Sequence, residues 1–427
     1  MNFKRPRGTS DILPQDQPHW SHIYSTASKI AEQFGFGRID TPTFEETNLF
    51  QRGVGDETDI VQKEMYSFED HGGDSITLRP EGTASVCRAY VENGLHNLPQ
   101  PVRMFYMTPM FRYERPQAGR MRQHHQFGCE IIGDSSPEVD AEIIELGWKY
   151  ITDLGIKGVT LRLNNLGDPR SRSGYLNDLK KYFTSVTNQL PQIDQKRLER
   201  APLRVLDSKH PDTQSLTDAA PRSVDYLTDE TKDHWTSLLT LLDNLKTTYP
   251  EFSYTIDHRL ARGLDYYNRT VFEYEPIGAT GQQTLLAGRR YDPLIGILGG
   301  QETPAIGFGS GIERMILEMK KQEVMVAPAK GPNIIIITIG DSDKASASLA
   351  TELRASGIST ILAPKRSLKA QMRYANNQKA ENVLILGDRE VNRGTVSFKN
   401  LAADGDQKEI KRDAATIAEH IRCNREI

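Results

Sequence analysis

The order of expected strands and helices changes near residue 330, and this change limits the folds open to the chain. Before it, amphipathic helices such as 138–154 stand among strands that return on themselves, without a repeating strand–helix–strand order. Strands paired through hairpins, with helices elsewhere, are typical of an antiparallel α+β domain. After residue 331 strand and helix patterns alternate, which predicts a separate small α/β domain with a largely parallel sheet.

Composition excludes several classes of protein. The 427 residues suffice for two to four domains, and 37% hydrophobic residues with 26% charged ones indicate a globular chain. The longest apolar run, 334–339, is far shorter than the roughly 20 residues that span a bilayer. With no signal-peptide pattern at the N-terminus, we expect no membrane contact and a cytoplasmic location. Cys87, Cys129 and Cys423 are too far apart for a disulfide framework or a CxxC site.

Residues 171–250 form a polar, helical stretch between two parts of the antiparallel domain. Its helical patterns, 175–189 and 229–248, carry no catalytic motif. We interpret the stretch as an inserted helical module.

The segment 110–130 reads as a strand, a loop and a returning strand. Because strand side chains alternate, Arg112 and Glu114 share one face, and His124 and Gln126 share one face with Glu130. The loop between the strands adds three guanidinium groups suited to phosphate oxygens, from Arg115, Arg120 and Arg122. Such a surface fits a triphosphate, and the alternative is a solvated hairpin whose charges pair with one another. Glu130 is different, because its small and apolar neighbours predict burial, and a buried carboxylate needs a partner.

Glu81 lies in a turn formed by Pro80 and Gly82 just before an amphipathic helix. Thr83 is expected to be the N-cap of that helix. Capping alone would explain Thr83, whereas a carboxylate held at a helix start would also suit the ammonium group of a ligand.

Two glycine-containing segments complete the set. Arg262 and Gly263 make a tight turn before a strand that contains Tyr267, which places a guanidinium beside a phenol. In 307–315, three alternate glycines leave a flat strand surface, and Arg314 follows in the first turn of a helix, where a cation is favoured only if an anion is present. No strand–helix–strand crossover surrounds these glycines, so they do not predict a dinucleotide fold.

Other motifs are absent from the sequence. His124 and His125 are adjacent and face opposite sides of a strand, and no HxxxH or HExxH occurs, so we expect no metal held by the protein itself. There is no GxxxxGK[ST] loop and no GxSxG elbow.

These segments, in this order, resemble the histidyl-tRNA synthetases, a family of class II aminoacyl-tRNA synthetases, over nearly the whole chain. RGTSDILP at the start, FGFGRIDTPTFEETNLFQRGVG as motif 1, FRYERP through GCE as motif 2 and GFGSGIERM as motif 3 all fit. RGLDYYNRTVFEY is the most specific, since it resembles the histidine-binding signature of this family. The resemblance implies a catalytic core over 1–325 with an antiparallel sheet flanked by helices, a helical insertion over 171–250 and an anticodon-binding α/β domain over 331–427.

The resemblance also implies how the catalytic residues Arg112, Arg262 and Arg314 act. Arg112 would contact the α-phosphate of ATP and Arg314 would lie near the γ-phosphate, while Arg262 would approach the substrate carboxylate and the α-phosphate. The full set implied to bind ATP is Arg112, Glu114, Arg120, His124 and Arg314.

Histidine would be held by a second set of residues in the resemblance. The imidazole would lie between Glu130 and Tyr267, and Tyr291 would be a further contact. The α-amino group would meet Glu81, Thr83 and Gln126. Arg115 and Gln117, in the motif 2 loop, would meet the acceptor end of the tRNA.

The implied reaction joins L-histidine and ATP to histidyl-adenylate and pyrophosphate, and then transfers histidine to the 3′ end of tRNA(His). The substrate carboxylate attacks ATP directly, so no protein nucleophile is required, and Mg²⁺ is carried by the phosphates. The family further implies a homodimer formed through motif 1.

Two positions depart from the family pattern. His124 stands where the family usually has an aromatic residue that stacks on adenine. Arg289 replaces a glycine of the GGRYD motif, which we place in a loop beside the amino-acid pocket. If that glycine requires positive φ, Arg289 would have a strained backbone.

Two non-catalytic relatives are the alternatives. The histidine-sensing regulatory subunit of ATP phosphoribosyltransferase would be expected to have lost the motif arginines and the tRNA-binding tail, yet Arg112, Arg314 and the C-terminal domain are present. A stress regulator that binds uncharged tRNA would carry a kinase signature, which the chain lacks, and it would not need Glu81, Gln126 and Arg262.

Overall fold

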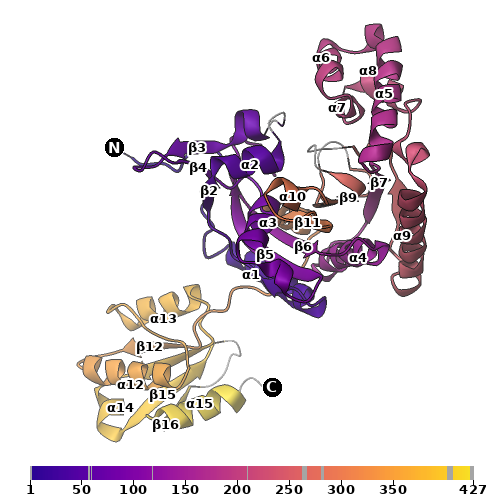
Figure 1. Cartoon of the computed structure of the whole chain (residues 1–427). Coiled ribbons are helices and arrows are strands. Elements are labelled where there is room, and N and C mark those ends of the chain that lie inside the picture. Colours follow the sequence, from indigo (N-terminus) through magenta and orange to yellow (C-terminus); the bar gives the residue numbers. More distant parts are fainter. Residues whose placement is uncertain are drawn as a thin grey trace. The chain divides into compact units, whose positions relative to one another are not determined.

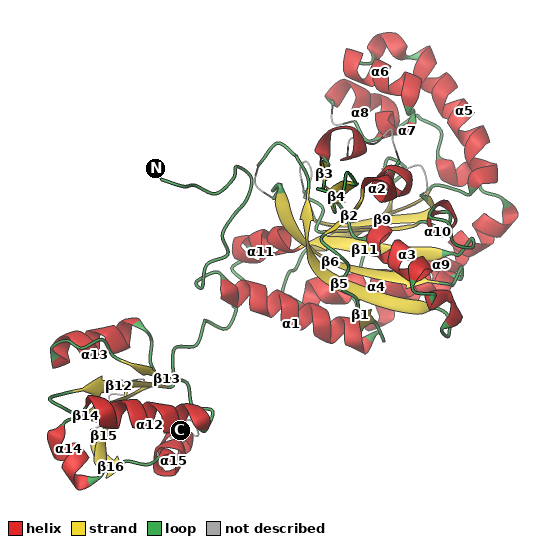
Figure 2. Ribbon diagram, turned by 60° about the vertical axis from the view of Figure 1, so that its left-hand side comes forward, coloured by secondary structure: helices red, strands yellow, loops and turns green. Residues whose placement is uncertain are grey.

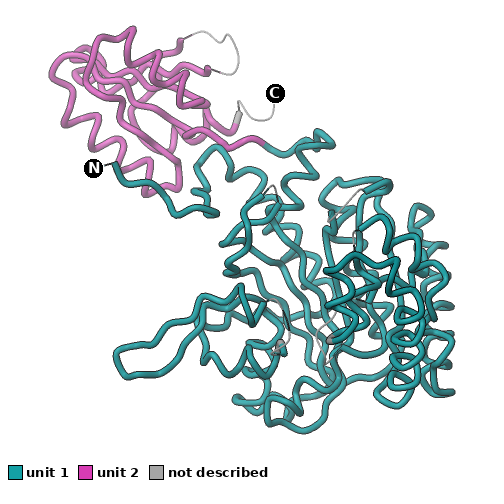
Figure 3. Tube along the Cα trace, turned by 90° about the horizontal axis from the view of Figure 1, so that it is seen from above, with its two compact units in different colours: residues 1–327 teal, residues 328–427 magenta. Residues whose placement is uncertain are grey.

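The computed structural model divides the chain into two compact units, 1–327 and 328–427, which Figure 3 distinguishes by colour. It describes residues 2–55, 58, 60–117, 119–208, 210–261, 267–279, 283–401 and 407–423. Each unit is described by itself below.

An eight-stranded sheet forms the centre of the first unit, in the order β1-β5-β6-β11-β10-β9-β7-β8. All neighbouring strands are antiparallel except the pairs β1·β5 and β7·β8. The expected antiparallel α+β architecture is therefore confirmed. The strands are β1 (Gly37–Arg38), β5 (Val102–Phe111), β6 (Gln123–Ile132), β7 (Val159–Asn165), β8 (Tyr254–Ile256), β9 (Asn268–Pro276), β10 (Leu286–Arg290) and β11 (Ala305–Gly311).

Helices pack on one face of this sheet (Figure 2). They are α1 (Gln17–Gln33), α4 (Pro137–Asp153), α9 (Asp229–Thr248) and α11 (Ile312–Lys321). In α4 the apolar residues Ile143, Ile144 and Ile151 recur at helical spacing and are fully buried against aromatic side chains of the sheet. This thick core makes the sheet a rigid platform for its other face.

The opposite face of the sheet is only partly covered. A second core lies there beneath α3 (Thr83–Glu92) and α10 (Leu294–Ile297). Beside it, α2 (Thr47–Val54), the π-helical turn η1 (Ile60–Glu64) and the 3₁₀ turn η2 (Leu95–Asn97) accompany a three-stranded sheet. That sheet contains β2 (Phe44–Glu46), β4 (Ser75–Leu78) and β3 (Tyr66–Glu69) in this order. The remaining open part of the large sheet is where the cavity described below lies.

Between β7 and β8 the described chain is helical (Figure 1). Asp168 caps the first of these helices by accepting from the backbone N–H groups of Arg170 and Ser171. The elements are α5 (Pro169–Ser185), η3 (Thr187–Gln189), α6 (Gln192–Arg200), α7 (Leu203–Leu206), α8 (Pro211–Thr217), η4 (Ser223–Tyr226) and α9. Below, we call the segment 169–248 the insertion.

The second unit contains a five-stranded sheet in the order β13-β12-β14-β15-β16. The apolar run that begins the unit is buried on both faces, since Ile334 and Ile336 face one core whereas Ile335 and Ile337 face the other. Its elements are β12 (Ile334–Thr338), α12 (Asp343–Ala355), β13 (Thr360–Leu362), α13 (Leu368–Asn377), β14 (Asn382–Leu386), α14 (Asp388–Arg393), β15 (Thr395–Asn400), β16 (Lys408–Lys411) and α15 (Ala414–Cys423).

The expectation of a largely parallel sheet is only half correct for this unit. β13, β12 and β14 are parallel, but β15 and β16 return antiparallel to the strands before them. The reason is the short α14, which ends at Gly394 in the left-handed conformation and turns the chain back instead of crossing the sheet.

No helix in the described residues is long and apolar enough to cross a bilayer.

Candidate active site

A cavity of about 650 Å³ lies over the open face of the large sheet. Its walls come from β6, β10 and β11, from the starts of α3 and α11, and from the loop after β5. Most of the residues that the sequence singled out lie together on its lining: Glu81, Thr83, Arg112, Glu114, Arg120, His124, Gln126, Tyr267, Tyr291 and Arg314.

The floor of the cavity contains the alternate glycines of β11 that the sequence predicted to leave a flat strand surface. On β11, Gly309 pairs with Gly128 of β6, and a Cβ at Gly309 would have no heavy atom closer than 3.5 Å. Gly307 is different, because a Cβ there would overlap the carboxylate of its partner Glu130. The glycines therefore leave room for a flat ligand at one position and for a protein carboxylate at the next.

Glu130 is fully buried directly behind the lining. Its carboxylate accepts hydrogen bonds from Tyr291 Oη at 2.6 Å, Thr83 Oγ1 at 2.8 Å and Tyr106 Oη at 3.3 Å. Burial raises the pKa of the Glu130 carboxyl to about 8, although these hydrogen bonds oppose the shift. The predicted burial and the predicted need for partners are both confirmed.

Glu81 caps α3, and the expectation that Thr83 is the N-cap is wrong. The Glu81 carboxylate accepts from the backbone N–H groups of Thr83 and Ala84 at 2.8 and 2.9 Å. Thr83 is the first residue of the helix, and its hydroxyl donates a hydrogen bond to Glu130 instead of capping the helix. Burial raises the pKa of Glu81, while the two backbone hydrogen bonds act in the opposite direction.

The other end of the cavity is lined by guanidinium groups anchored on backbone carbonyls. Arg112 donates from Nε to the carbonyl of Pro80 at 2.7 Å. Arg314, in the first turn of α11, donates to the carbonyls of Gly119 and Thr284, each at 3.0 Å. These carbonyls hold both arginines in place, so this end is pre-organised for an anion.

Glu114 and Arg120 meet at the same end, with Arg120 Nε 3.4 Å from Glu114 Oε2. His124 also lines this end, on β6. Burial, followed by the charges of Arg112 and Arg314, lowers the pKa of His124 to about 3. Its imidazole is thus neutral and can offer a flat face beside the two cations.

Arg289 lies in strand β10, not in a loop, and the strain considered for it is absent. The non-glycine residues with positive φ in the described chain are Arg269, Glu323 and Lys379. The Arg289 side chain extends over the cavity wall, where its guanidinium carbon lies 4.6 Å from the centre of the Tyr267 ring.

The remaining predicted residues lie apart from the main cavity or outside the described chain. Arg115 lines a neighbouring cavity of about 470 Å³ together with Arg7 and Tyr113. Gln117 pairs through its backbone with Arg120. Arg262 lies outside the described residues.

Sequence reasoning missed Tyr106 on β5. Its ring fills the space that Cβ atoms would take at Gly82 and Gly128, and its hydroxyl reaches Glu130. The two glycines were a usable signal, since both lie in segments that the sequence singled out. The insertion residues Arg197, Arg204 and Asp207, which also reach the lining, offered no such signal.

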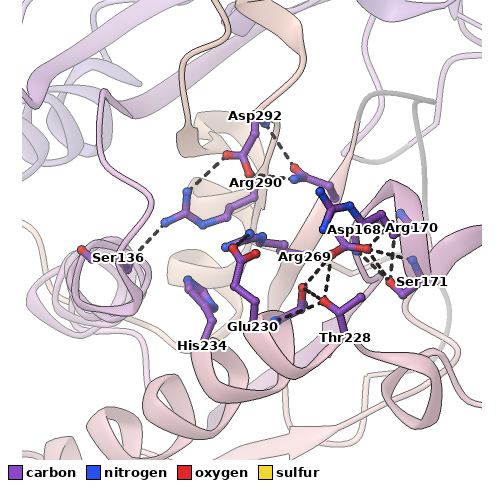
Figure 4. Close-up of polar contacts among 12 residues, drawn as sticks. Ser136, Asp168, Arg170, Ser171, Thr228, Glu230, His234, Arg269, Arg290 and Asp292 are labelled. Atoms are coloured by element: carbon purple, nitrogen blue, oxygen red, sulfur yellow. Dashed lines mark hydrogen bonds and ion pairs between the residues drawn. The ribbon is translucent and has the colours of Figure 1, made fainter.

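A buried ionic network supports β9 and β10, the strands that border Tyr267 and Tyr291 of the cavity lining, and Figure 4 shows its Arg290, Asp292 and Ser136 contacts. Arg290, fully buried, lies 2.7 Å from Asp140 and 3.2 Å from Asp292, and it donates to the carbonyl of Ser136. Thr270 donates to the other oxygen of Asp140. Because a buried charge without a partner costs several kcal/mol, these contacts fix the positions of β9 and β10.

Between those strands the register shifts, so that Arg290 pairs with Asn268 while Arg289 pairs with Val271. Arg269 occupies the resulting bulge with a φ of 48°, and its side chain lies 2.6 Å from Glu230 of α9. Bulges beside a site commonly re-aim neighbouring side chains, and Tyr267 lies two residues before Arg269.

Comparison with known proteins assigns the chain to a family. Residues 8–315 match the family described as histidyl-tRNA synthetase, and residues 324–418 match the anticodon binding domain. A histidine–tRNA ligase of Dehalococcoides mccartyi is 45% identical over 405 residues, which cover 94% of this chain and 96% of that protein.

Solved structures agree. The apo histidyl-tRNA synthetase of S. aureus superposes with a TM-score of 0.80 at 33% identity, covering 99% of both chains. A protein from Bacillus halodurans C, described as an ATP phosphoribosyltransferase regulatory subunit/histidyl-tRNA synthetase, shares the fold at 19% identity, with a TM-score of 0.64 over 90% of this chain and 98% of that one. The sheet, its glycine floor and the arginine-lined cavity are those of a class II aminoacyl-tRNA synthetase. Within that class, the chain belongs to the histidyl-tRNA synthetase family.

Proposed function

We propose that the cavity activates L-histidine with ATP and then passes the histidyl group to the 3′ end of tRNA(His). The observation that carries this proposal is Glu130, a carboxylate buried behind the cavity and held by Thr83, Tyr106 and Tyr291. A site built around a buried acceptor selects a ligand that supplies the matching N–H group, and it rejects analogues that leave the acceptor unpaired. An imidazole supplies such a group.

At the amino-acid end, different residues bind the imidazole ring and the α-ammonium group of histidine. The imidazole lies between Glu130 and Tyr267, with Tyr291 alongside. The α-ammonium group faces Glu81, Thr83 and Gln126, which all line the cavity. Burial raises the pKa of Glu130 to about 8 without substrate, and a hydrogen bond from the N–H group of histidine would lower this pKa by stabilising the ionised carboxylate.

At the other end we assign ATP to the anchored cations. Arg112 stabilises the charge that develops on the α-phosphate while the substrate carboxylate attacks it, and Arg314 holds the γ-phosphate as pyrophosphate leaves. Glu114 and Arg120 complete the nucleotide site, and the neutral ring of His124 stacks on adenine.

Further parts of the proposal rest on the sequence resemblance. Arg262 approaches the carboxylate and the α-phosphate, and Arg115 and Gln117 meet the acceptor end of tRNA(His). Mg²⁺ enters as part of the ATP substrate; within the described residues no group of three or more His, Cys, Asp or Glu side chains is arranged to hold a metal. A homodimer, anticodon reading by the C-terminal unit and a cytoplasmic location belong to the same proposal.

The test is amino-acid-dependent exchange of labelled pyrophosphate into ATP, with all standard amino acids tried in the presence of Mg²⁺. Exchange with histidine alone is the expected result. Exchange with another amino acid would overturn the imidazole assignment, and histidine binding without any exchange would instead favour a non-catalytic histidine sensor.

A further inference from the structure

Arg289 makes two contacts with one side chain, Tyr267. Its guanidinium carbon lies 4.6 Å from the centre of the ring, and its Nη1 donates to Tyr267 Oη at 3.1 Å. Both residues line the cavity. The stacking and the hydrogen bond together fix the phenol ring and also orient its hydroxyl group.

The sheet register brings this pair to face Glu130. Arg289 pairs with Gly307, and Gly307 pairs with Glu130, so the three residues form one row across β10, β11 and β6. Directly paired residues of antiparallel strands point to the same face of a sheet. The two outer side chains thus start roughly 10 Å apart, at two strand spacings, with only a glycine between them.

The hydrogen-bond inventory of a phenol decides what this arrangement does. A tyrosine hydroxyl has a single hydrogen, and arginine can only donate. Since Arg289 already donates to Tyr267 Oη, the phenolic hydrogen must point elsewhere and can be given to an acceptor. Across the row, Glu130 accepts hydrogen bonds from three hydroxyl groups. An ionised carboxylate has about four acceptor sites, so it can accept one further hydrogen bond from an N–H group.

A neutral imidazole has one N–H donor and one acceptor nitrogen on the same ring. We propose that Arg289 is a positioning residue that commits the Tyr267 hydroxyl to donate to the acceptor nitrogen of the histidine ring, while Glu130 receives the ring N–H. This inference rests on the proposed function, because it refines how the same cavity holds histidine. Arg289 acts through Tyr267 and need not touch the substrate.

The experiment is a double-mutant cycle on full-length protein with pyrophosphate exchange as readout. Arg289→Met keeps the length of the side chain and its packing on the ring but removes every donor. We expect KM for histidine to rise roughly tenfold, which corresponds to one charge-assisted hydrogen bond, while kcat stays within about twofold. Tyr267→Phe should raise KM similarly, and the double variant should be no worse than Tyr267→Phe alone.

Two further measurements distinguish orientation of the hydroxyl from general damage. Arg289→Lys, which retains a donor, should recover most of the lost affinity. β-(2-Thienyl)alanine, whose ring contains neither nitrogen, cannot accept a hydrogen bond from Tyr267 Oη and should inhibit the wild-type protein and Arg289→Met with equal Ki. Arg103→Met, which removes a guanidinium paired with Glu142 outside the cavity, is the matched control and should leave KM unchanged.

Additive effects of Arg289→Met and Tyr267→Phe would overturn the inference, and so would an equal loss of affinity for the thienyl analogue. A fall in KM on removing Arg289 would instead show that this side chain obstructs the pocket. Failure of the proposed function is a separate result, since it would appear as absent histidine-dependent exchange in the wild-type protein.

Discussion

The two ends of the cavity are pre-organised by opposite means. At the amino-acid end, the carboxylates of Glu130 and Glu81 are fixed by hydroxyl and N–H donors, and burial raises the pKa of both. At the nucleotide end, the guanidinium groups of Arg112 and Arg314 are fixed by carbonyl oxygens. One sheet face thus holds a subsite that selects the amino acid beside a subsite that stabilises charge, because each charged group has its own hydrogen-bond partners. Changes at the two ends should therefore have separable effects.

Replacing Glu130 by glutamine should have the largest effect on activity. The amide NH2 group would face the hydroxyl and imidazole groups that also donate, and these donors would lose their acceptor. We therefore expect histidine-dependent exchange to fall roughly 1,000-fold. Pyrophosphate exchange and circular dichroism of the purified variant measure activity and folding. Glu142→Gln, which removes a carboxylate paired with Arg103 outside the cavity, is the control. Near-normal exchange in a folded Glu130→Gln protein would contradict the assignment of the amino-acid end.

Arg112→Ala tests the nucleotide end. Loss of one pre-organised donor to the developing charge should lower kcat about 100-fold, while KM for histidine changes less than threefold. Steady-state exchange with each substrate varied in turn separates the two constants, and Arg103→Ala serves as the control. A large rise in KM for histidine with normal kcat would show that the two ends are not separable in this way.

The stability of the substrate-free protein should depend on pH through Glu130. Its pKa is raised from the ordinary 4.5 to about 8, so its contribution to stability is complete below pH 4.5 and is lost as pH rises toward 8. We expect the free energy of unfolding of the wild-type protein to fall by about 2 to 4 kcal/mol across this interval, relative to Glu130→Gln. Urea denaturation of both proteins at pH 5 and pH 8 measures the difference. Parallel pH profiles for the two proteins would argue against the raised pKa.

The smallest effect is expected at His124. Since its pKa of about 3 keeps the ring neutral, KM for ATP should not respond to titration of this side chain between pH 5.5 and 8. His124→Phe, which restores the aromatic residue usual in the family, should lower KM for ATP about threefold through stronger stacking. A KM that rises steeply below pH 6.5 in wild type but not in His124→Phe would show that the histidine titrates.

Much of the large sheet and of its site could be predicted from the sequence, because the period of two along a strand places His124 and Gln126 on one face. Burial of Glu130 followed from its small and apolar neighbours in the sequence. What could not be predicted depends on register between strands, as with Tyr106, which reaches Glu130 from β5. The helix cap was mispredicted for a different reason: the Glu81 carboxylate accepts from the free N–H groups of Thr83 and Ala84, while the Thr83 hydroxyl donates to Glu130.

The C-terminal unit shows the same limit on prediction. Its first strand, β12, is buried on both faces and gives a clear apolar signal, whereas β16 is a short polar strand, KEIK, with one buried residue, Ile410. A strand of that kind is defined by its pairing with β15 and not by its own composition.

The bulge at Arg269 joins the insertion to the wall of the cavity. Arg172 of α5 donates to the carbonyl of Tyr267 at 2.8 Å, and Glu230 of α9 holds the Arg269 side chain. A chain shortened by joining residue 168 to residue 249 would lose both contacts, and we expect the unfavourable backbone conformation at Arg269 to relax. The insertion is thus no detachable accessory: in evolution or in engineering, α5 and α9 have to change in step with the histidine signature that they hold in shape, and Arg197, Arg204 and Asp207 bring its other helices to the cavity lining.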